Sequence, residues 1–292
     1  MKSLYDIAAP AKLNLFLHIT GRKSDGYHLL QSVFMLIDWC DNLHFELRSD
    51  GGISREDLGT PLPVDDLVLR AARALKSASG CPLGVHIGIE KTIPTQAGMG
   101  GGSSDAASTL LALNRLWNLD FSLEKLTQIG LKLGADVPFF LGGCNAWAEG
   151  IGEKLTPVVL PQSRFLVVKP AQGLETKSIF LDPNLKRDSE RAIISGFAAD
   201  AFGFGRNDLQ SVAQRLCPGV SQALEWLAAR GLNGRMTGSG SAVFAHVLHD
   251  IDLAHAPKAF QLRLCNNLDV HPLVGWATSD GFRLAAFSCQ PV

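Results

Sequence analysis

The sequence predicts a two-domain chain that mixes β-strands and α-helices. Its 292 residues exceed the usual length of a single domain. Hydrophobic residues make up 46% of the chain and charged residues 19%, which provides for a sizeable core and argues against disorder. Two proline-containing pairs, Thr156-Pro157 and Leu160-Pro161, interrupt the pattern near the middle. We therefore expect one domain over residues 1–160 and a second over residues 161–292.

The charge balance and the cysteine spacing exclude several classes of protein. The formal net charge is −1, so no basic excess suggests a nucleic-acid partner. No apolar run reaches the length of a membrane span, and the first residues resemble neither a signal nor a transit peptide. We expect a cytoplasmic protein with no membrane, nucleic-acid or obligate protein partner. Six cysteines without metal-site spacing read as buried thiols: Cys40, Cys81, Cys144, Cys217, Cys265 and Cys289.

Residue periodicity defines the elements of the first half. Residues 11–19 alternate between an apolar face and a face that carries Lys12 and Asn14, as in a half-buried strand. A solvated charge at a strand end is the ordinary interpretation of Lys12, but the shared face with Asn14 keeps a functional role open. The other expected elements are a turn at 21–28, antiparallel strands at 33–40 and 43–47, a helix capped by Asp65 or Asp66 that stops near Gly80, a strand at 85–90, and helices at 106–117 and 122–133.

A glycine-rich segment over residues 94–104 lies between the strand at 85–90 and the helix at 106–117. Four glycines in five positions exceed the need of an ordinary turn, and they let backbone N–H groups and a helix N-terminus approach an anion. Ser103 stands where a Walker A loop needs lysine and a dinucleotide fingerprint needs glycine. We also expect Ser103 or Ser104 to cap the helix, but capping alone leaves the glycines unexplained. We predict phosphate binding by Pro94, Thr95, Gln96, Ala97, Gly98, Met99, Gly100, Gly101, Gly102, Ser103 and Ser104.

An aspartate follows the helix at 122–133 in the segment Gly134-Ala-Asp136-Val-Pro138-Phe-Phe. A carboxylate beside two phenylalanines is poorly placed for solubility alone, so a functional role is open. The competing interpretation is that Asp136 only caps the next turn. The sequence does not decide between the two.

The second half repeats the mixture of strands and helices. A second glycine-rich turn, over residues 231–245, joins two strands. His246 and His249 lack a surrounding carboxylate cluster, so we interpret them as ordinary side chains. The remaining expected elements are a strand at 165–168, a short helix at 175–180, a polar connection at 182–206, helices at 208–216 and 220–230, a helix near 257–265 and a strand near 274–277.

Several separated segments together resemble the GHMP small-molecule kinases. The resemblance covers nearly the whole chain and lies in the first motif at 10–15, the second at 94–107 and the third at 238–241. Ser24-Asp25-Gly26-Tyr27-His28 and Gly134-Ala-Asp136-Val-Pro138 are closer still to the branch that phosphorylates the 2-hydroxyl of 4-diphosphocytidyl-2-C-methyl-D-erythritol in the non-mevalonate isoprenoid pathway. Asp66 is a departure, since relatives often carry asparagine there, beside the adenine pocket.

The resemblance implies a fold, two small-molecule partners and a set of site residues. The fold would be α+β, the two-domain GHMP kinase fold with the active site in the cleft between domains. The partners would be ATP with Mg²⁺ and the diphosphocytidyl methylerythritol substrate. Lys12 and Asp136 would be the catalytic pair: Asp136 as the base, and Lys12 to keep it ionised and to steady the alkoxide. Substrate contacts would fall on Asn14, Tyr27, His28, Thr176 and Phe180.

Two other functions are compatible with parts of the sequence. One is a related kinase for homoserine or mevalonate, which would lack the Gly26-Tyr27-His28 signal present here. The other is a sensor of the same fold that binds nucleotide without catalysis, which would have no need of both Lys12 and Asp136. Tyr27 and Phe180 have an alternative too: they could be core aromatics instead of two walls that sandwich cytosine.

Overall fold

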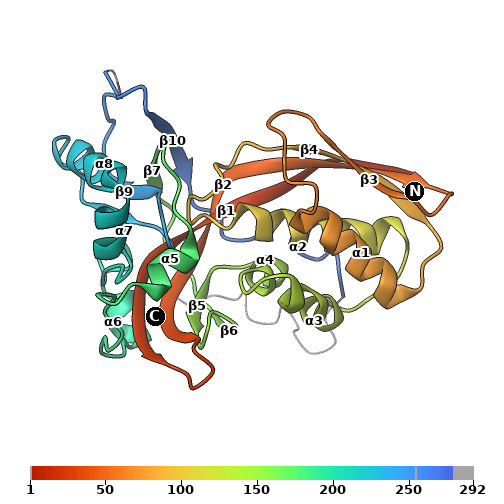
Figure 1. Ribbon diagram of the computed structural model, residues 1–292, viewed down its shortest axis with the longest axis horizontal. Helices are drawn as coiled ribbons and strands as arrows, with labels where there is room; N and C mark the ends of the chain where they lie inside the picture. Colours follow the sequence, from red (N-terminus) through yellow and green to blue (C-terminus); the bar gives the residue numbers. More distant parts are fainter. Residues whose placement is uncertain (1, 254, 279–292) are drawn as a thin grey trace.

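The computed structural model describes residues 2–253 and 255–278, which fold around two β-sheets (Figure 1). The larger sheet has the order β3-β4-β2-β5-β6, with β1 paired to β2, and the smaller has the order β10-β7-β9-β8. The larger sheet contains β1 (Ser3–Arg22), β2 (His28–Arg48), β3 (Ile53–Asp57), β4 (Gly84–Glu90), β5 (Ala146–Glu149) and β6 (Lys154–Pro157). The smaller contains β7 (Arg164–Pro170), β8 (Gly234–Met236), β9 (Val243–Val247) and β10 (Phe260–Asn266).

A long antiparallel hairpin, β1 and β2, connects the two halves of the molecule (Figure 1). The two strands predicted at 33–40 and 43–47 are one continuous strand, so that prediction was wrong. The half-buried strand was wrong as well, because both faces of the hairpin are covered. Phe34 and Leu36 pack with the helices of the first half, whereas Met35 packs in the same cluster as Phe165 of β7. This double coverage buries every residue from 9 to 17 of β1.

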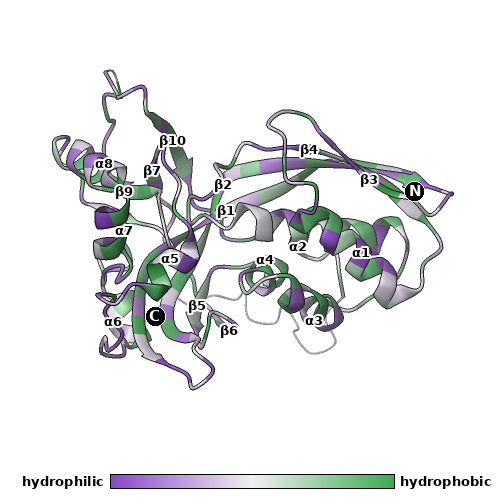
Figure 2. Ribbon diagram, viewed as in Figure 1, coloured by the Kyte–Doolittle hydropathy of each residue, from purple (hydrophilic) through white to green (hydrophobic). Residues whose placement is uncertain are grey.

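Four helices cover one face of the larger sheet: α1 (Leu67–Ser79), α2 (Gly101–Leu116), α3 (Leu123–Leu133) and α4 (Val137–Gly142). Asp66 caps α1, because its carboxylate accepts a hydrogen bond from the Leu69 N–H at 3.0 Å. Gly80 ends that helix in the left-handed conformation, and Ser122 caps α3. These boundaries confirm the predicted ones. Hydrophobic residues recur at helical spacing along α1 (Figure 2). Its buried side consists of Val68, Leu69, Ala71, Ala72 and Leu75.

The second half places α7 (Gln210–Leu216) and α8 (Pro218–Ala228) against the smaller sheet, with α5 (Thr176–Leu181) and α6 (Ile194–Ala198) in the connection. The helix predicted near 257–265 is instead β10, antiparallel to β7. Phe260, Leu262 and Leu264 alternate with Gln261 and Arg263, a period of two that the prediction overlooked. The strand predicted at 274–277 was also wrong, since these residues form turns.

The chain returns to the first half after β10. The N–H groups of Leu268 and His271 donate to the carbonyls of Leu36 and Gly143, at 2.9 and 2.8 Å. The last described residues therefore pack beside the larger sheet, and a domain boundary after residue 160 stays a prediction. Five cysteines have free thiols, three of them buried, and Cys289 lies outside the described residues. Among the described helices, none has the length and hydropathy that a membrane crossing needs.

Candidate active site

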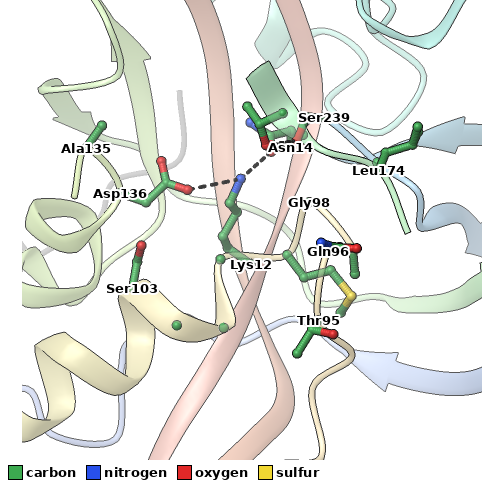
Figure 3. A pocket seen from close by; sticks show the side chains of 18 of the residues that line it. Lys12, Asn14, Thr95, Gln96, Gly98, Ser103, Ala135, Asp136, Leu174 and Ser239 are labelled. Carbon is green, nitrogen blue, oxygen red and sulfur yellow. Dashed lines mark hydrogen bonds and ion pairs between the residues drawn. The ribbon is translucent and has the colours of Figure 1, made fainter. Parts of the chain in front are cut away.

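A cavity of about 670 Å³ opens between the hairpin, the glycine-rich segment, α4 and the second half of the chain (Figure 3). It brings together residues that are distant in the sequence. The sequence-predicted site residues that line it are Lys12, Asn14, Pro94 to Ser103, Asp136, Thr176 and Phe180. Three predicted residues do not line it: Ser104, Tyr27 and His28.

The glycine-rich segment leads directly into the N-terminus of α2. Gly100 occupies the N-cap with φ of 73°, and no side chain caps the helix. The prediction that Ser103 or Ser104 caps it was therefore wrong, because the helix begins at Gly101 and both serines lie within its first turn. The first N–H groups of an α-helix have no partner inside the helix, and the dipole places partial positive charge there. The cavity wall at residues 100–103 is thus suited to an anion.

Gly98 fixes the segment against the second glycine-rich turn. Its φ is 73°, and a Cβ built on it would lie 2.2 Å from the carbonyl oxygen of Thr237. The N–H groups of Ser241 and Ala242 also donate to the carbonyls of Gln96 and Ala97, at 3.1 and 3.2 Å. Glycine is required at position 98 because only glycine combines this φ with such close approach. The two glycine-rich turns therefore form one floor of the cavity.

Lys12 points into the cavity between two oxygen-bearing side chains (Figure 3). Its Nζ donates to Asn14 Oδ1 at 2.5 Å and lies 3.6 Å from Asp136 Oδ2. The Lys12 side chain is 5% exposed, while that of Asp136 is 32% exposed. Asn14 in turn donates through Nδ2 to Ser32 Oγ at 2.8 Å. The ammonium group is therefore held in one place, and the solvated-charge interpretation of Lys12 was wrong.

Asp136 occupies the N-cap position of α4, but its side chain makes no capping hydrogen bond. The carboxylate faces Lys12 and the cavity instead, so capping does not explain this residue. The helix behind it is anchored in the core, since Val137, Pro138, Phe139 and Phe140 are all buried. A carboxylate within reach of a cation, partly open to the cavity, can accept a proton from a bound hydroxyl group.

A buried ion cluster that sequence reasoning missed lies next to the glycine-rich segment. Lys91 Nζ lies 2.6 Å from Asp105 Oδ2 and also pairs with Asp41. Burial raises the pKa of Asp105, and Lys91 opposes that rise. Burial by itself would lower the pKa of Lys91, but the two carboxylates outweigh it and the net shift is upward. Asp41 also accepts the Ile93 N–H at 2.8 Å, so the cluster connects β2, the end of β4 and α2.

Tyr27 and Phe180, the two aromatic residues predicted to sandwich cytosine, do not face each other as a preformed pair of rings. Phe180 stacks on His28, with ring centroids 5.1 Å apart and planes inclined by 30°. Tyr27 is 62% exposed, which excludes a core role for it. Thr176 Oγ1 and Ser239 Oγ are 2.7 Å apart. Arg187, which sequence reasoning missed, donates to His28 Nε2 at 3.0 Å; it lies in the polar connection and no motif marks it.

Asp66, the departure noted above, forms an ion pair with Arg55. The Arg55 Nη1 lies 2.8 Å from Asp66 Oδ1, and both side chains are nearly buried. The carboxylate therefore serves α1 and Arg55 in this chain.

A model of the GHMP kinases N terminal domain matches residues 66–144, and one of the GHMP kinases C terminal matches residues 190–262. The chain is 82% identical, over 280 residues, to a 4-diphosphocytidyl-2-C-methyl-D-erythritol kinase of Albidiferax ferrireducens, covering 96% of this chain and 98% of the relative.

Solved structures give the same result. A crystal structure of a 4-(cytidine 5'-diphospho)-2C-methyl-D-erythritol kinase matches with a TM-score of 0.75 and 34% identity, covering 89% of this chain and 98% of the other. A homoserine kinase from Cytophaga hutchinsonii matches with a TM-score of 0.67 but 15% identity, covering 93% and 96%. At that identity the second match shows the fold alone.

Proposed function

The chain belongs to the 4-diphosphocytidyl-2-C-methyl-D-erythritol kinase family of GHMP kinases, and from this premise we propose how its own residues perform the transfer. It is a kinase with the α+β GHMP fold. The proposed reaction moves the γ-phosphoryl group of ATP to the 2-hydroxyl of 4-diphosphocytidyl-2-C-methyl-D-erythritol. The observation that carries the proposal is the placement of Lys12 and Asp136 opposite the glycine-rich segment in one cavity.

Asp136 is the proposed base and Lys12 the group that orients it. Phosphoryl transfer requires chiefly positioning and charge stabilisation, with a base near the attacking hydroxyl. The carboxylate takes the hydroxyl proton as the oxygen attacks the γ-phosphorus, and the bond from this phosphorus to the β–γ bridging oxygen breaks to release ADP. The ammonium lies 3.6 Å from that carboxylate, where it orients the base and stabilises negative charge that develops on the attacking oxygen. Asn14 holds the ammonium in place.

The glycine-rich segment is the proposed site of the ATP phosphates. Residues 100–103 at the start of α2 line the cavity, and glycine at 100, 101 and 102 lets phosphate oxygens approach the backbone N–H groups of the helix N-terminus closely. The second turn, at Gly238 to Gly240, borders the same space. ATP would thus be held with its terminal phosphate toward Asp136.

Mg²⁺ fits the donors that face this space. The Ser103 hydroxyl and the Asp136 carboxylate line the same cavity, and Mg²⁺ commonly takes one or two such protein ligands beside phosphate oxygens and water. Ser104 is fully buried and outside the cavity lining, so of the two serines Ser103 is the proposed ligand. When bound, the ion neutralises phosphate charge during transfer.

The cytidyl end of the substrate is proposed to lie between the start of β2 and α5. Phe180 presents an aromatic surface to the cavity there, and Tyr27 is exposed close by in sequence to His28. Thr176 is one turn before Phe180 on α5 and borders the same space. A flat base could stack on these rings.

The replacement Asp136→Asn tests the proposal. It preserves the size of the side chain but removes the proton acceptor, so kcat for the cytidyl substrate should fall by a factor of about 10²–10⁴ with little change in the KM for ATP. The assay measures ADP release through coupled enzymes. Homoserine and mevalonate are tested as competing phosphoryl acceptors. Asp120→Asn, an exposed position outside the cavity, is the matched control.

Two results would contradict this proposal in different ways. A kcat for Asp136→Asn within a few-fold of the unaltered enzyme would remove proton transfer by Asp136 from the mechanism. Preference of the unaltered enzyme for homoserine or mevalonate would contradict the substrate. ATP binding without turnover on any acceptor would favour the sensor.

A further inference from the structure

His28 lies at the edge of the cavity, where the proposed base site begins. Its ring stacks on Phe180, and Phe180 lines the cavity. Leu30 also lines the cavity, and it lies two residues after His28 on the same strand, so both side chains leave β2 on the same face. A base stacked in this region would therefore have the His28 ring edge beside it.

Arg187 fixes the hydrogen-bonding state of that ring. Its Nε donates to His28 Nε2 at 3.0 Å. Arginine has five N–H donors and no acceptor, and it stays protonated in proteins. The His28 Nε2 atom must therefore be the acceptor, which leaves the ring proton of a neutral imidazole on Nδ1.

The guanidinium of Arg187 has little freedom to turn away. Its Nη1 donates to the carbonyl of Leu185 at 3.0 Å, and its Nη2 donates to the carbonyls of Phe180 and Asp182, at 3.2 and 2.7 Å. These three carbonyls belong to α5 and the turn that follows it. The same arginine thus ties the His28 ring to the helix that carries Phe180.

The surroundings also keep the ring neutral. Burial lowers the pKa of His28, and the positive charges of Arg187 and Arg22 lower it further. A neutral ring with Nε2 occupied has one remaining polar edge, the Nδ1–H group. Within the described part of the chain, no side-chain or backbone acceptor is found for this group.

We propose that Arg187 is a specificity-determining residue for the nucleobase, because it holds His28 as the Nδ1–H tautomer and so presents a donor to the base. The discriminating partner is N3, which is an acceptor in cytosine but carries a hydrogen in uracil that would oppose the His28 donor; O2 accepts in both bases. A donor that meets another donor is left unpaired, which weakens binding. This inference rests on the proposed cytidyl substrate and explains how its base is chosen.

The test compares kcat/KM for the cytidyl substrate and for its uridyl analogue. Arg187→Met removes all hydrogen-bond donors of the side chain while keeping a similar length. The His28 ring can then adopt either neutral tautomer. The preference for cytidyl over uridyl should then fall at least ~10-fold, about the worth of one hydrogen bond, while the KM for ATP stays unchanged. Arg191→Met, an exposed position in the same connection, is the matched control and should keep the preference.

A second pair of variants tests whether Arg187 acts through the His28 tautomer. In His28→Asn the amide nitrogen can occupy the place of Nδ1 and donate without help from Arg187. The preference should then no longer change when Arg187→Met is added. An equal loss of activity on both substrates, with the preference kept, would show that Arg187 only supports α5 and would overturn the inference.

Nitrogen NMR of the unaltered enzyme tests the His28 tautomer directly and does not depend on the folding of any variant. Nitrogen-15 shifts and two-bond couplings of His28 should show a neutral ring protonated at Nδ1. A proton on Nε2 would overturn the inference. Failure of the unaltered enzyme to phosphorylate the cytidyl substrate would instead contradict the proposed function, so the two failures are distinguishable.

Discussion

Replacing Gly98 by alanine should separate the two glycine-rich turns that form the cavity floor. Residue 98 has φ of 73°, and a non-glycine residue held in such a region costs about 1–3 kcal/mol. The added Cβ would also lie 2.2 Å from the Thr237 carbonyl oxygen and 2.8 Å from the Gly240 nitrogen. Backbone atoms cannot yield as a flexible side chain does, so the turns must move apart.

That movement lengthens the two hydrogen bonds between the turns, made by the N–H groups of Ser241 and Ala242. Each is worth roughly 0.5–1.5 kcal/mol. Together with the backbone term, the loss of stability comes to about 2–6 kcal/mol, or at least ~4 °C in the midpoint of thermal unfolding at ~2–4 °C per kcal/mol. The KM for ATP should rise because the phosphate site loses its support.

Gly102→Ala is the matched control for this prediction. Residue 102 lies in the same segment and lines the same cavity, but its built Cβ meets only Leu67 Cδ1 at 3.4 Å and its φ is not positive. Alanine inside a helix is favoured over glycine by up to about 1 kcal/mol. Scanning calorimetry of both variants and ATP titration of Gly98→Ala check the prediction; Gly102→Ala is a control for stability only, because residue 102 lines the proposed phosphate site. An unchanged midpoint and ATP affinity in Gly98→Ala would refute the reasoning.

Three further predictions concern the base site and two buried charges. Tyr27→Ala should raise the KM for the cytidyl substrate roughly 5- to 150-fold, the value of one stacking contact, with little change in the midpoint of thermal unfolding. Tyr5→Ala, at another exposed tyrosine, should leave this KM unchanged. The same KM in Tyr27→Ala and in the unaltered enzyme would show that Tyr27 does not belong to the site. Lys91→Met leaves two buried carboxylates without their cation, so denaturant unfolding should show a loss of about 3–5 kcal/mol. Burial lowers the pKa of His271 to about 4, below its ordinary value, so the folded state resists protonation that the unfolded chain accepts. Stability should therefore fall by ~2 kcal/mol from pH 7 to pH 5, and His271→Asn should lose that part of the pH dependence.

The sequence by itself determined the local features that require particular residue types. Glycines at 98 and 100 indicated a backbone that other residues cannot adopt, and both have positive φ. The sequence placed the start of α1 at Asp65 or Asp66 and its end near Gly80, because capping depends on neighbouring residues, and the caps are Asp66 and Gly80. The shared face of Lys12 and Asn14 followed from strand periodicity, and their side chains are in fact hydrogen-bonded. The motifs also identified the family, which the relatives confirm.

The tertiary structure decided everything that depends on contacts between distant segments. Strand periodicity shows which residues share a face, but not that the smaller sheet covers the Leu13 face of β1 while Phe34 and the start of α2 pack against Lys12 on the other face and bury it. Whether Asp136 capped a turn or faced a cation depended on where α4 packs relative to β1. Arg187 lies in a polar connection with no local signal, and only folding brings it to His28. Such pairs are fixed by packing of the whole chain, because neither partner's neighbours in sequence specify the other.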